Sequence, residues 1–269
     1  MNKINQLFSE HTDSKLLSLY FCAGSPEAEC TGPVILAMQR RGISMVEVGI
    51  PFSDPMADGP AIQDAATTAL RNGMTLRRLF GQLAEIKDQV HIPLVLMGYL
   101  NPILQYGIDA FCQSCVASGV SGMIIPDLPF KDYLEQVKPV ADCYDLRVVM
   151  LITPETSEER IRFIDQNTDG FVYMVSSAAT TGAQQSFDEQ KQAYFRRINA
   201  MHLRNPRMIG FGISNRQTLQ SAQQNAAGAI IGSKFVTLLK EAYSQAPEGT
   251  GMDRVAETAL DRLFAALER

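Results

Sequence analysis

The chain has 269 residues, of which 46% are hydrophobic and 20% charged. This composition is that of an ordinary folded protein, and it excludes the collagen-like, coiled-coil and disordered classes. The formal charge is −5, and the basic residues are dispersed, so we expect neither a nucleic-acid-binding stripe nor a polybasic membrane patch. The longest apolar stretch, 92–100, has nine residues, whereas a membrane-spanning helix needs about 20.

The five cysteines have an odd count and no regular spacing, which is typical of reduced intracellular thiols. Cys112 and Cys115 form a lone CxxC in a segment expected to be helical. Because a zinc site needs about four ligands and the sequence offers no second cluster, we predict no metal. The polar N-terminus lacks a signal-peptide core, so we expect a cytoplasmic protein.

Short runs rich in Val, Ile, Leu and Met recur along the chain, each followed by a turn and then an amphipathic segment. Most runs are apolar without alternation, as expected for strands that helices cover on both faces. The predicted strands are 16–23, 45–50, 93–99, 122–126, 147–152, 171–175, 208–213 and 229–232.

The intervening segments have apolar residues at helical spacing, and several begin with Ser, Thr or Asp. The predicted helices are 27–41, 76–89, 109–118, 132–143, 157–167, 188–201, 216–225 and 252–267. Strand-helix units without a compositional break predict the α/β class, as a single (β/α)8 TIM barrel over residues 1–269 with extra N-terminal and loop helices. The rival, a doubly wound sheet with a second domain, would show a Gly-rich dinucleotide turn and a linker, which are not visible.

Glu47 is the most unusual residue, because it lies inside a predicted strand where an ionised carboxylate is costly. Strand alternation places Gly49 on the same face, and its small size is expected to leave room for a ligand above the barrel. Two interpretations remain open: a carboxylate tied to an Arg, or a partly desolvated acid and base.

The longest gap between predicted strands begins with Asp54-Pro-Met-Ala-Asp-Gly-Pro60, which indicates a functional loop. Asp58, and to a lesser degree Asp54, is close enough in sequence to Glu47 for its side chain to reach the same opening of the barrel. Two carboxylates in different environments can divide acid-base and electrostatic roles.

Three late segments have the small residues that let backbone N–H groups approach a phosphate, two of them at helix starts. They are Ser176-Ser-Ala-Ala-Thr-Thr-Gly182, Phe211-Gly-Ile-Ser214 and Gly232-Ser-Lys234. The polar segment 176–189 is predicted to be a lid that orders over the ligand. No Lys lies in a predicted strand and the three His are far apart, which argues against a Schiff base, a metal cluster and a Ser-His-Asp triad.

The run Glu47-Val-Gly-Ile-Pro-Phe-Ser-Asp-Pro-Met-Ala-Asp-Gly-Pro60 closely resembles the signature of the tryptophan synthase α subunit family. The order and spacing of further segments fit that family over essentially the whole chain: Tyr99-Leu-Asn-Pro102, Ile125-Pro-Asp-Leu-Pro129, Phe171-Val-Tyr173, Thr181-Gly182, Phe211-Gly-Ile-Ser214 and Gly232-Ser233. The resemblance implies a lyase that splits indole-3-glycerol phosphate into indole and glyceraldehyde 3-phosphate, without metal or organic cofactor.

The resemblance also implies a role for individual residues. Glu47 is expected to be the acid and base, Asp58 to bind the indole N–H, and Tyr173 to lie beside Glu47. The residues expected to wall the indole are Tyr20, Met97, Tyr99 and Leu128, and those expected to hold the phosphate are Thr181, Gly182, Phe211, Gly212, Gly232 and Ser233. Lys234 stands where a small residue is expected, and it either points to solvent or adds charge to the phosphate site.

The family resemblance implies a partner as well, a β subunit that carries pyridoxal phosphate and receives indole through a tunnel in an α2β2 complex. The loop 51–60 and Asn101-Pro102 are the expected contact. Two alternatives remain: another phosphate-binding barrel enzyme, such as a sugar-phosphate isomerase or a prenyl transferase, and a non-catalytic regulatory subunit that binds a phosphate ligand.

Overall fold

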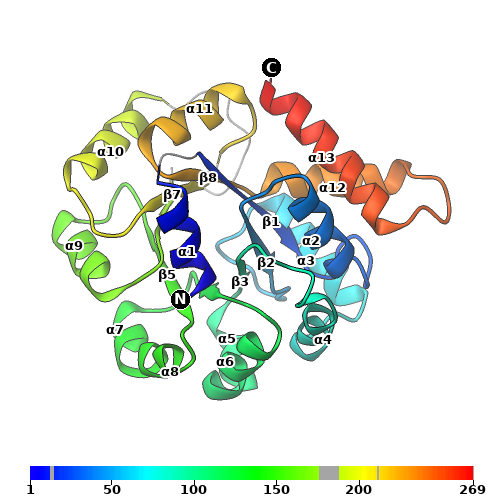
Figure 1. Ribbon diagram of the computed structural model, residues 1–269, viewed down its shortest axis with the longest axis horizontal. Helices are drawn as coiled ribbons and strands as arrows, with labels where there is room; N and C mark the ends of the chain where they lie inside the picture. Colours follow the sequence, from blue (N-terminus) through cyan, green and yellow to red (C-terminus); the bar gives the residue numbers. More distant parts are fainter. Residues whose placement is uncertain (13–14, 176–187, 211, 269) are drawn as a thin grey trace.

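The computed structural model describes residues 1–12, 15–175, 188–210 and 212–268. At its centre is a closed barrel of parallel strands, in which each strand pairs with the next and β8 pairs with β1 (Figure 1). The strands are β1 Leu16–Cys22, β2 Met45–Gly49, β3 Leu94–Met97, β4 Gly122–Ile124, β5 Arg147–Ile152, β6 Val172–Val175, β7 Arg207–Gly210 and β8 Gly228–Ile231. The predicted TIM barrel is confirmed.

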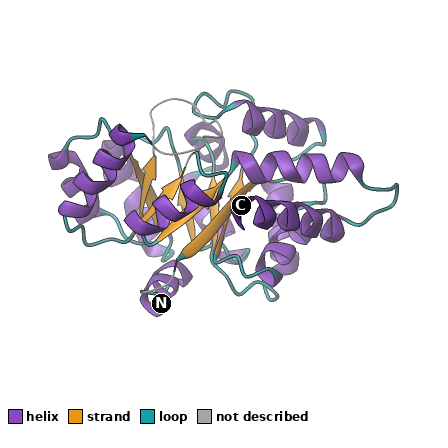
Figure 2. Cartoon of the chain, turned by 90° about the horizontal axis from the view of Figure 1, so that it is seen from above, coloured by secondary structure: helices purple, strands orange, loops and turns teal. Residues whose placement is uncertain are grey.

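Helices surround the barrel, as both views show (Figures 1 and 2). They are α1 Lys3–Glu10, α2 Thr31–Arg40, α3 Pro60–Arg71, α4 Leu76–Ile86, α5 Leu100–Tyr106, α6 Ile108–Ala117, α7 Phe130–Asp132, the π-helical turn η1 Tyr133–Val137, α8 Lys138–Cys143, α9 Glu158–Asn167, α10 Glu189–Ala200, α11 Arg216–Asn225, α12 Ser233–Gln245 and α13 Met252–Glu268. Among the described residues, no helix combines the length and the apolar character that crossing a bilayer requires.

Several predicted bounds differ from the structure. The helix predicted over 27–41 begins only at Thr31, and the strand predicted over 208–213 ends at Gly210. Two further differences have a local cause. The segment 132–143 is divided among α7, η1 and α8, because Pro139, in the first turn of α8, has no N–H for the α-helical ladder. The strand predicted over 93–99 is only Leu94–Met97, since the chain turns at Gly98 before α5 begins at Leu100. The additional helices α1, α3 and α5 are the predicted N-terminal and loop helices.

Inward-facing side chains fill the lower part of the barrel. This interior cluster contains Leu16, Met45, Val95, Ile124, Val149, Phe171, Met208 and Ile230, together with Ile4 of α1. The Nδ2 of Asn2 donates to the carbonyl oxygens of Ser121, at 2.8 Å, and Asp145, at 2.6 Å, both just before strands begin. Helix α1 therefore covers the N-terminal end of the barrel interior.

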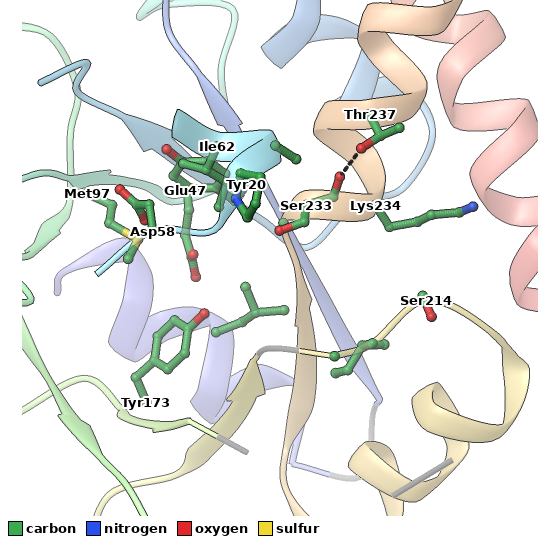
Figure 3. A pocket seen from close by; sticks show the side chains of 16 residues that line it. Tyr20, Glu47, Asp58, Ile62, Met97, Tyr173, Ser214, Ser233, Lys234 and Thr237 are labelled. Carbon is green, nitrogen blue, oxygen red and sulfur yellow. Dashed lines mark hydrogen bonds between the residues drawn. The ribbon is translucent and has the colours of Figure 1, made fainter. Parts of the chain in front are cut away.

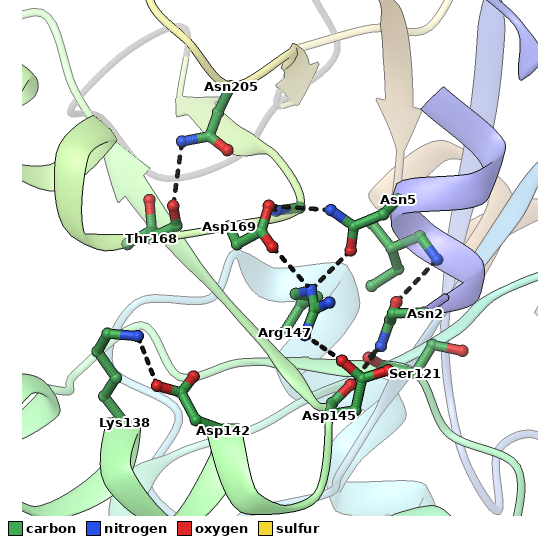
Figure 4. Close-up of polar contacts among 12 residues, drawn as sticks. Asn2, Asn5, Ser121, Lys138, Asp142, Asp145, Arg147, Thr168, Asp169 and Asn205 are labelled. Carbon is green, nitrogen blue, oxygen red and sulfur yellow. Dashed lines mark hydrogen bonds and ion pairs between the residues drawn. The ribbon is translucent and has the colours of Figure 1, made fainter. Parts of the chain in front are cut away.

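Polar side chains tie α1 to the ends of β5 and β6 (Figure 4). The Nε of Arg147 donates to Oδ1 of Asn5 at 2.6 Å and lies 3.2 Å from Oδ2 of Asp169, and the Nδ2 of Asn5 donates to Asp169 at 2.9 Å. Burial raises the pKa of Asp169, but the Gly170 amide, Asn5 and the Arg147 charge outweigh that effect and hold it below its usual value.

We expect Asp169→Asn to destabilise the fold at neutral pH by about 0.5–1 kcal/mol, the range for a half-exposed pair. A lowered pKa contributes stability above the unfolded pKa, and this contribution is lost as the pH falls through the folded value. The difference between the two proteins in urea unfolding should therefore vanish at acid pH. If the free energies of unfolding of wild type and Asp169→Asn differ by the same amount at every pH, the Asp169 charge is not the cause.

Gly228 lies where β8 meets β1, and a Cβ there would stand 2.3 Å from the carbonyl oxygen of Leu16. Since that oxygen is backbone, the strands must separate, and Gly228→Ala should cost about 2–4 kcal/mol in urea unfolding. The matched control is Gly81→Ala in α4, where a Cβ meets nothing within 4 Å and the change should be neutral or stabilising by up to about 1 kcal/mol. Equal stabilities of the two variants would contradict the prediction.

Candidate active site

A cavity of about 400 Å³ opens at the C-terminal end of the barrel (Figure 3), the end at which enzymes of this fold bind their substrates. It is lined by Tyr20, Glu47, Asp58, Pro60, Ala61, Ile62, Met97, Tyr173, Gly212, Ile213, Ser214, Ile230, Gly232, Ser233, Lys234 and Thr237. Its floor is the apolar interior of the barrel, and its rim is formed by the loops and helix starts that follow the strands.

Glu47 projects from β2 into this cavity and has no solvent-exposed surface. Its Oε1 accepts a hydrogen bond from the hydroxyl of Ser18 at 3.5 Å, and its buried Oε2 has no partner in the described structure. Burial raises the pKa of Glu47 to about 8, against the smaller opposite effect of Ser18, and no cation contributes. The described residues therefore offer no support for the interpretation as an ion pair, and the carboxyl is suited to exchange protons near neutral pH.

Asp58 lies on the same side of the cavity as Glu47 (Figure 3). The Tyr99 hydroxyl donates to Oδ2 of Asp58 at 3.0 Å and accepts from the Ala57 amide at 2.9 Å, so it fixes the loop after β2. Burial raises the pKa of Asp58, and the Tyr99 hydrogen bond opposes this. Asp54, by contrast, is exposed, and its carboxylate accepts from the neighbouring Ser53 hydroxyl at 2.5 Å.

Two tyrosine side chains at the C-terminal end of the barrel pack directly against glycines of neighbouring strands. A Cβ at Gly49 would lie 2.1 Å from the Tyr20 hydroxyl oxygen, and a Cβ at Gly210 would lie 2.2 Å from that of Tyr173. The expectation that Gly49 leaves room for a ligand is therefore wrong, because Tyr20 occupies that room. Burial raises the pKa of both tyrosines well above the ordinary value, so their hydroxyls stay neutral.

The far end of the cavity is suited to an anion. Helix α12 begins at Ser233 without a side-chain cap, and the buried Oγ of Ser233 has no partner among the described residues. Its first backbone N–H groups are therefore available donors, reinforced by the helix dipole. Helix α11 differs, since Asn215 and Thr218 form a capping box there.

The structure brings most of the predicted site residues together at this cavity: Tyr20, Glu47, Asp58, Met97, Tyr173, Gly212, Gly232 and Ser233. Tyr99 and Leu128 do not line it. Tyr99 lies behind Asp58 as its hydrogen-bond donor, and Leu128 packs in the core between barrel and helices. Thr181, Gly182, Phe211 and nearly all of the predicted lid lie outside the described residues.

Five lining residues were missed by sequence reasoning: Pro60, Ala61, Ile62, Ile230 and Thr237. Two simple signals could have found some of them. Ile230 precedes Gly232 by two positions, the strand period, and Thr237 follows Ser233 by four positions, one helical turn. Lys234 lies on the rim, and its half-buried side chain extends away from both carboxylates (Figure 3).

The CxxC motif does not contribute to the cavity. Cys112 and Cys115 are buried in α6, and burial raises the pKa of Cys112 to about 11, which makes its thiol unreactive. Within the described ranges, no three His, Cys, Asp or Glu side chains gather as metal ligands would.

The comparisons of this chain with known proteins all indicate the same family. Residues 8–263 match the family described as tryptophan synthase alpha chain. The chain is 62% identical to the tryptophan synthase alpha chain of Phocaeicola vulgatus over 100% of both chains, and 64% identical to that of Bacteroides fragilis over 99% of this chain and 97% of the relative. The crystal structure of tryptophan synthase subunit alpha from Legionella pneumophila superposes with a TM-score of 0.86 at 32% identity, over 100% of this chain and 99% of that one. The chain therefore belongs to the tryptophan synthase alpha chain family, and it is a lyase that cleaves indole-3-glycerol phosphate.

Proposed function

We propose that the cavity is where indole-3-glycerol phosphate is cleaved to indole and glyceraldehyde 3-phosphate, with Glu47 as the acid and base. The observation that carries this proposal is a fully buried carboxyl with a pKa raised to about 8 and one unpartnered oxygen at the cavity, within the described structure. Such a group holds a proton part of the time near neutral pH, so it can both give one and take one.

The reaction requires two proton transfers. Glu47 first protonates C3 of the indole ring, which turns the ring into an iminium that can accept electrons. The carboxylate then takes the proton of the side-chain hydroxyl, the carbon-carbon bond breaks, and its electron pair restores the aromatic indole while the other carbon becomes an aldehyde. One proton is given and one is taken, so Glu47 ends in its starting state.

Asp58 is proposed to accept a hydrogen bond from the indole N–H and to stabilise the positive charge that develops there. Its support is its position at the cavity beside Glu47 and the Tyr99 hydroxyl that holds it in place. A preorganised charge of this kind acts on the transition state more than on the substrate.

The remaining residues are proposed to bind the two ends of the substrate. Tyr20, Met97 and Ile62 lie around the carboxylates and would pack on the indole, while the neutral Tyr173 hydroxyl would contact Glu47 or substrate. The phosphate would rest on the amides at the start of α12 and at Gly212. By family resemblance Thr181, Gly182 and Phe211 would complete the phosphate site, Leu128 would support the indole wall, and the segment 176–189 would close as a lid.

The wider organisation is proposed on the same basis. Residues 1–269 would act as one catalytic domain, because the barrel closes between its first and last strands. The partner would be a β subunit that carries the pyridoxal phosphate, in an α2β2 complex in the cytoplasm, and this chain would need no cofactor. Exposed apolar side chains support a contact at loop 51–60 and α5: Met56 is 87% exposed and Leu104 is 47% exposed.

The test is indole release from indole-3-glycerol phosphate by the purified chain, alone and with a tryptophan synthase β subunit. We expect indole in both cases, faster turnover with the partner, and a sedimenting complex of two chains of each kind. No indole with the partner present would favour the non-catalytic subunit. Turnover of a different phosphate ester instead would favour another barrel enzyme.

A further inference from the structure

The side chain of Ser18 places a hydroxyl in the apolar interior of the barrel beneath the cavity. Strand alternation points Leu16, Ser18 and Tyr20 of β1 inward. Leu16 belongs to the interior cluster and Tyr20 lines the cavity, so Ser18 lies between the two layers. Its strand partners are Met45 in β2 and Ile230 in β8, both members of that apolar cluster.

The Ser18 hydroxyl has no access to solvent, since the residue is 0% exposed. Its hydrogen bond goes to Oε1 of Glu47, 29 residues further along the chain, at 3.5 Å. A buried hydroxyl without a partner is unfavourable, so this contact favours the arrangement in which the Ser18 and Glu47 side chains meet. The other carboxyl oxygen, Oε2, is buried and unpartnered among the described residues.

We infer that Ser18 is a positioning residue for Glu47: from the barrel floor its hydroxyl holds Oε1, so that Oε2 is the oxygen presented to the substrate. This inference rests on the proposed role of Glu47 as acid and base, and it adds the group that orients that carboxyl. Ser18 itself does not touch the reacting atoms.

The hydrogen bond from Ser18 to Glu47 can form whether the carboxyl is ionised or protonated. When Glu47 is ionised, the Ser18 O–H donates to a carboxylate oxygen; when Glu47 is protonated on Oε2, the same O–H donates to the carbonyl oxygen. The distance is long for a hydrogen bond, and such contacts at active sites tighten when substrate binds. The proton exchanged with the substrate is thereby confined to Oε2.

Other titratable groups face Glu47 from neighbouring elements of the described structure. Tyr20 of β1 and Tyr173 of β6 are neutral, because their pKa values are raised well above the ordinary value. Asp58 is the other carboxyl that lines the cavity in the described structure, and Lys234 on the rim points away. Ser18 favours the charged form of Glu47 and lowers its pKa, against the larger effect of burial.

The first test compares Ser18→Thr with Ser18→Val, which have the same shape and differ by the hydroxyl, beside Ser18→Ala. For indole release, we expect Val and Ala to lower kcat by about tenfold and to raise the pH midpoint of kcat by about one unit, with KM within about twofold. Thr should retain most of the wild-type kcat and midpoint. If Ser18→Thr and Ser18→Val have the same kcat and the same pH midpoint of kcat, the inference is overturned, because the hydroxyl would then have no effect on Glu47.

The second test does not depend on activity. The infrared band of the protonated Glu47 carboxyl, identified by its absence in Glu47→Gln, is followed as a function of pH. Its midpoint should rise in Ser18→Ala and Ser18→Val and stay near wild type in Ser18→Thr, and an unchanged midpoint in all three would overturn the inference. If the band shifts as expected while Glu47→Gln still releases indole, the contact stands and the proposed acid-base role of Glu47 fails.

Discussion

Replacing Glu47 with Gln is expected to lower kcat for indole release by about 10²–10⁴-fold, the usual contribution of a positioned acid and base. Gln keeps the shape of the side chain and can accept the Ser18 hydrogen bond, but it cannot give and retake the proton. The measurement is the rate of indole formation at saturating substrate. Glycerol 3-phosphate serves as the control ligand, because its binding at the start of α12 should be unchanged.

The same variant should alter stability with a definite pH dependence. The pKa of Glu47 is about 8 in the folded protein, above the ordinary value of 4.5. The unfolded chain therefore loses this proton first as the pH rises, and wild-type stability falls from about pH 4.5 to about pH 8, by roughly 1.4 kcal/mol per unit of difference. Glu47→Gln lacks this loss, so it should be the more stable protein at pH 9 in urea unfolding. If wild type is at least as stable as Glu47→Gln at pH 9, Glu47 is not a buried carboxyl without a charged partner.

Asp58→Asn is expected to lower kcat by about 10²–10³-fold, the magnitude found when one preorganised electrostatic group is removed from an active site. The amide retains the size of the carboxylate and loses its negative charge, so the charge that develops on the indole nitrogen is no longer stabilised. Because this charge is absent from the ground state, KM should change much less than kcat.

Two variants serve as controls for Asp58. Tyr99→Phe removes the hydroxyl that donates to Asp58 and binds the Ala57 amide, so it should cost only about tenfold, because the charge remains but is held less firmly. Asp54→Asn, in the same loop but exposed and outside the cavity lining, should leave kcat unchanged. If Asp54→Asn were as damaging as Asp58→Asn, the loop as a whole would matter, and not the charge at Asp58.

Strand positions and the barrel were predictable because their signals are local. Each buried parallel strand is a short apolar run, and each run is followed by a segment with helical spacing. Glu47 was conspicuous for the same reason, since a carboxylate inside such a run conflicts with its surroundings. Two boundaries that failed have local causes: Pro139 lacks the N–H that an α-helix needs, and α5 begins at Leu100, so β3 ends earlier than its apolar run suggests.

The sequence by itself determined the strand-helix order of this protein, the inward position of Glu47 and the run of residues that resembles a known family. Only the tertiary structure decided which groups meet: that Tyr20 fills the space above Gly49, that Tyr99 holds Asp58 from behind, and that Ser18 reaches Oε1 of Glu47. The physical reason is that alternation along one strand assigns a side chain to a face, whereas a contact between strands depends on the register in which the whole barrel closes.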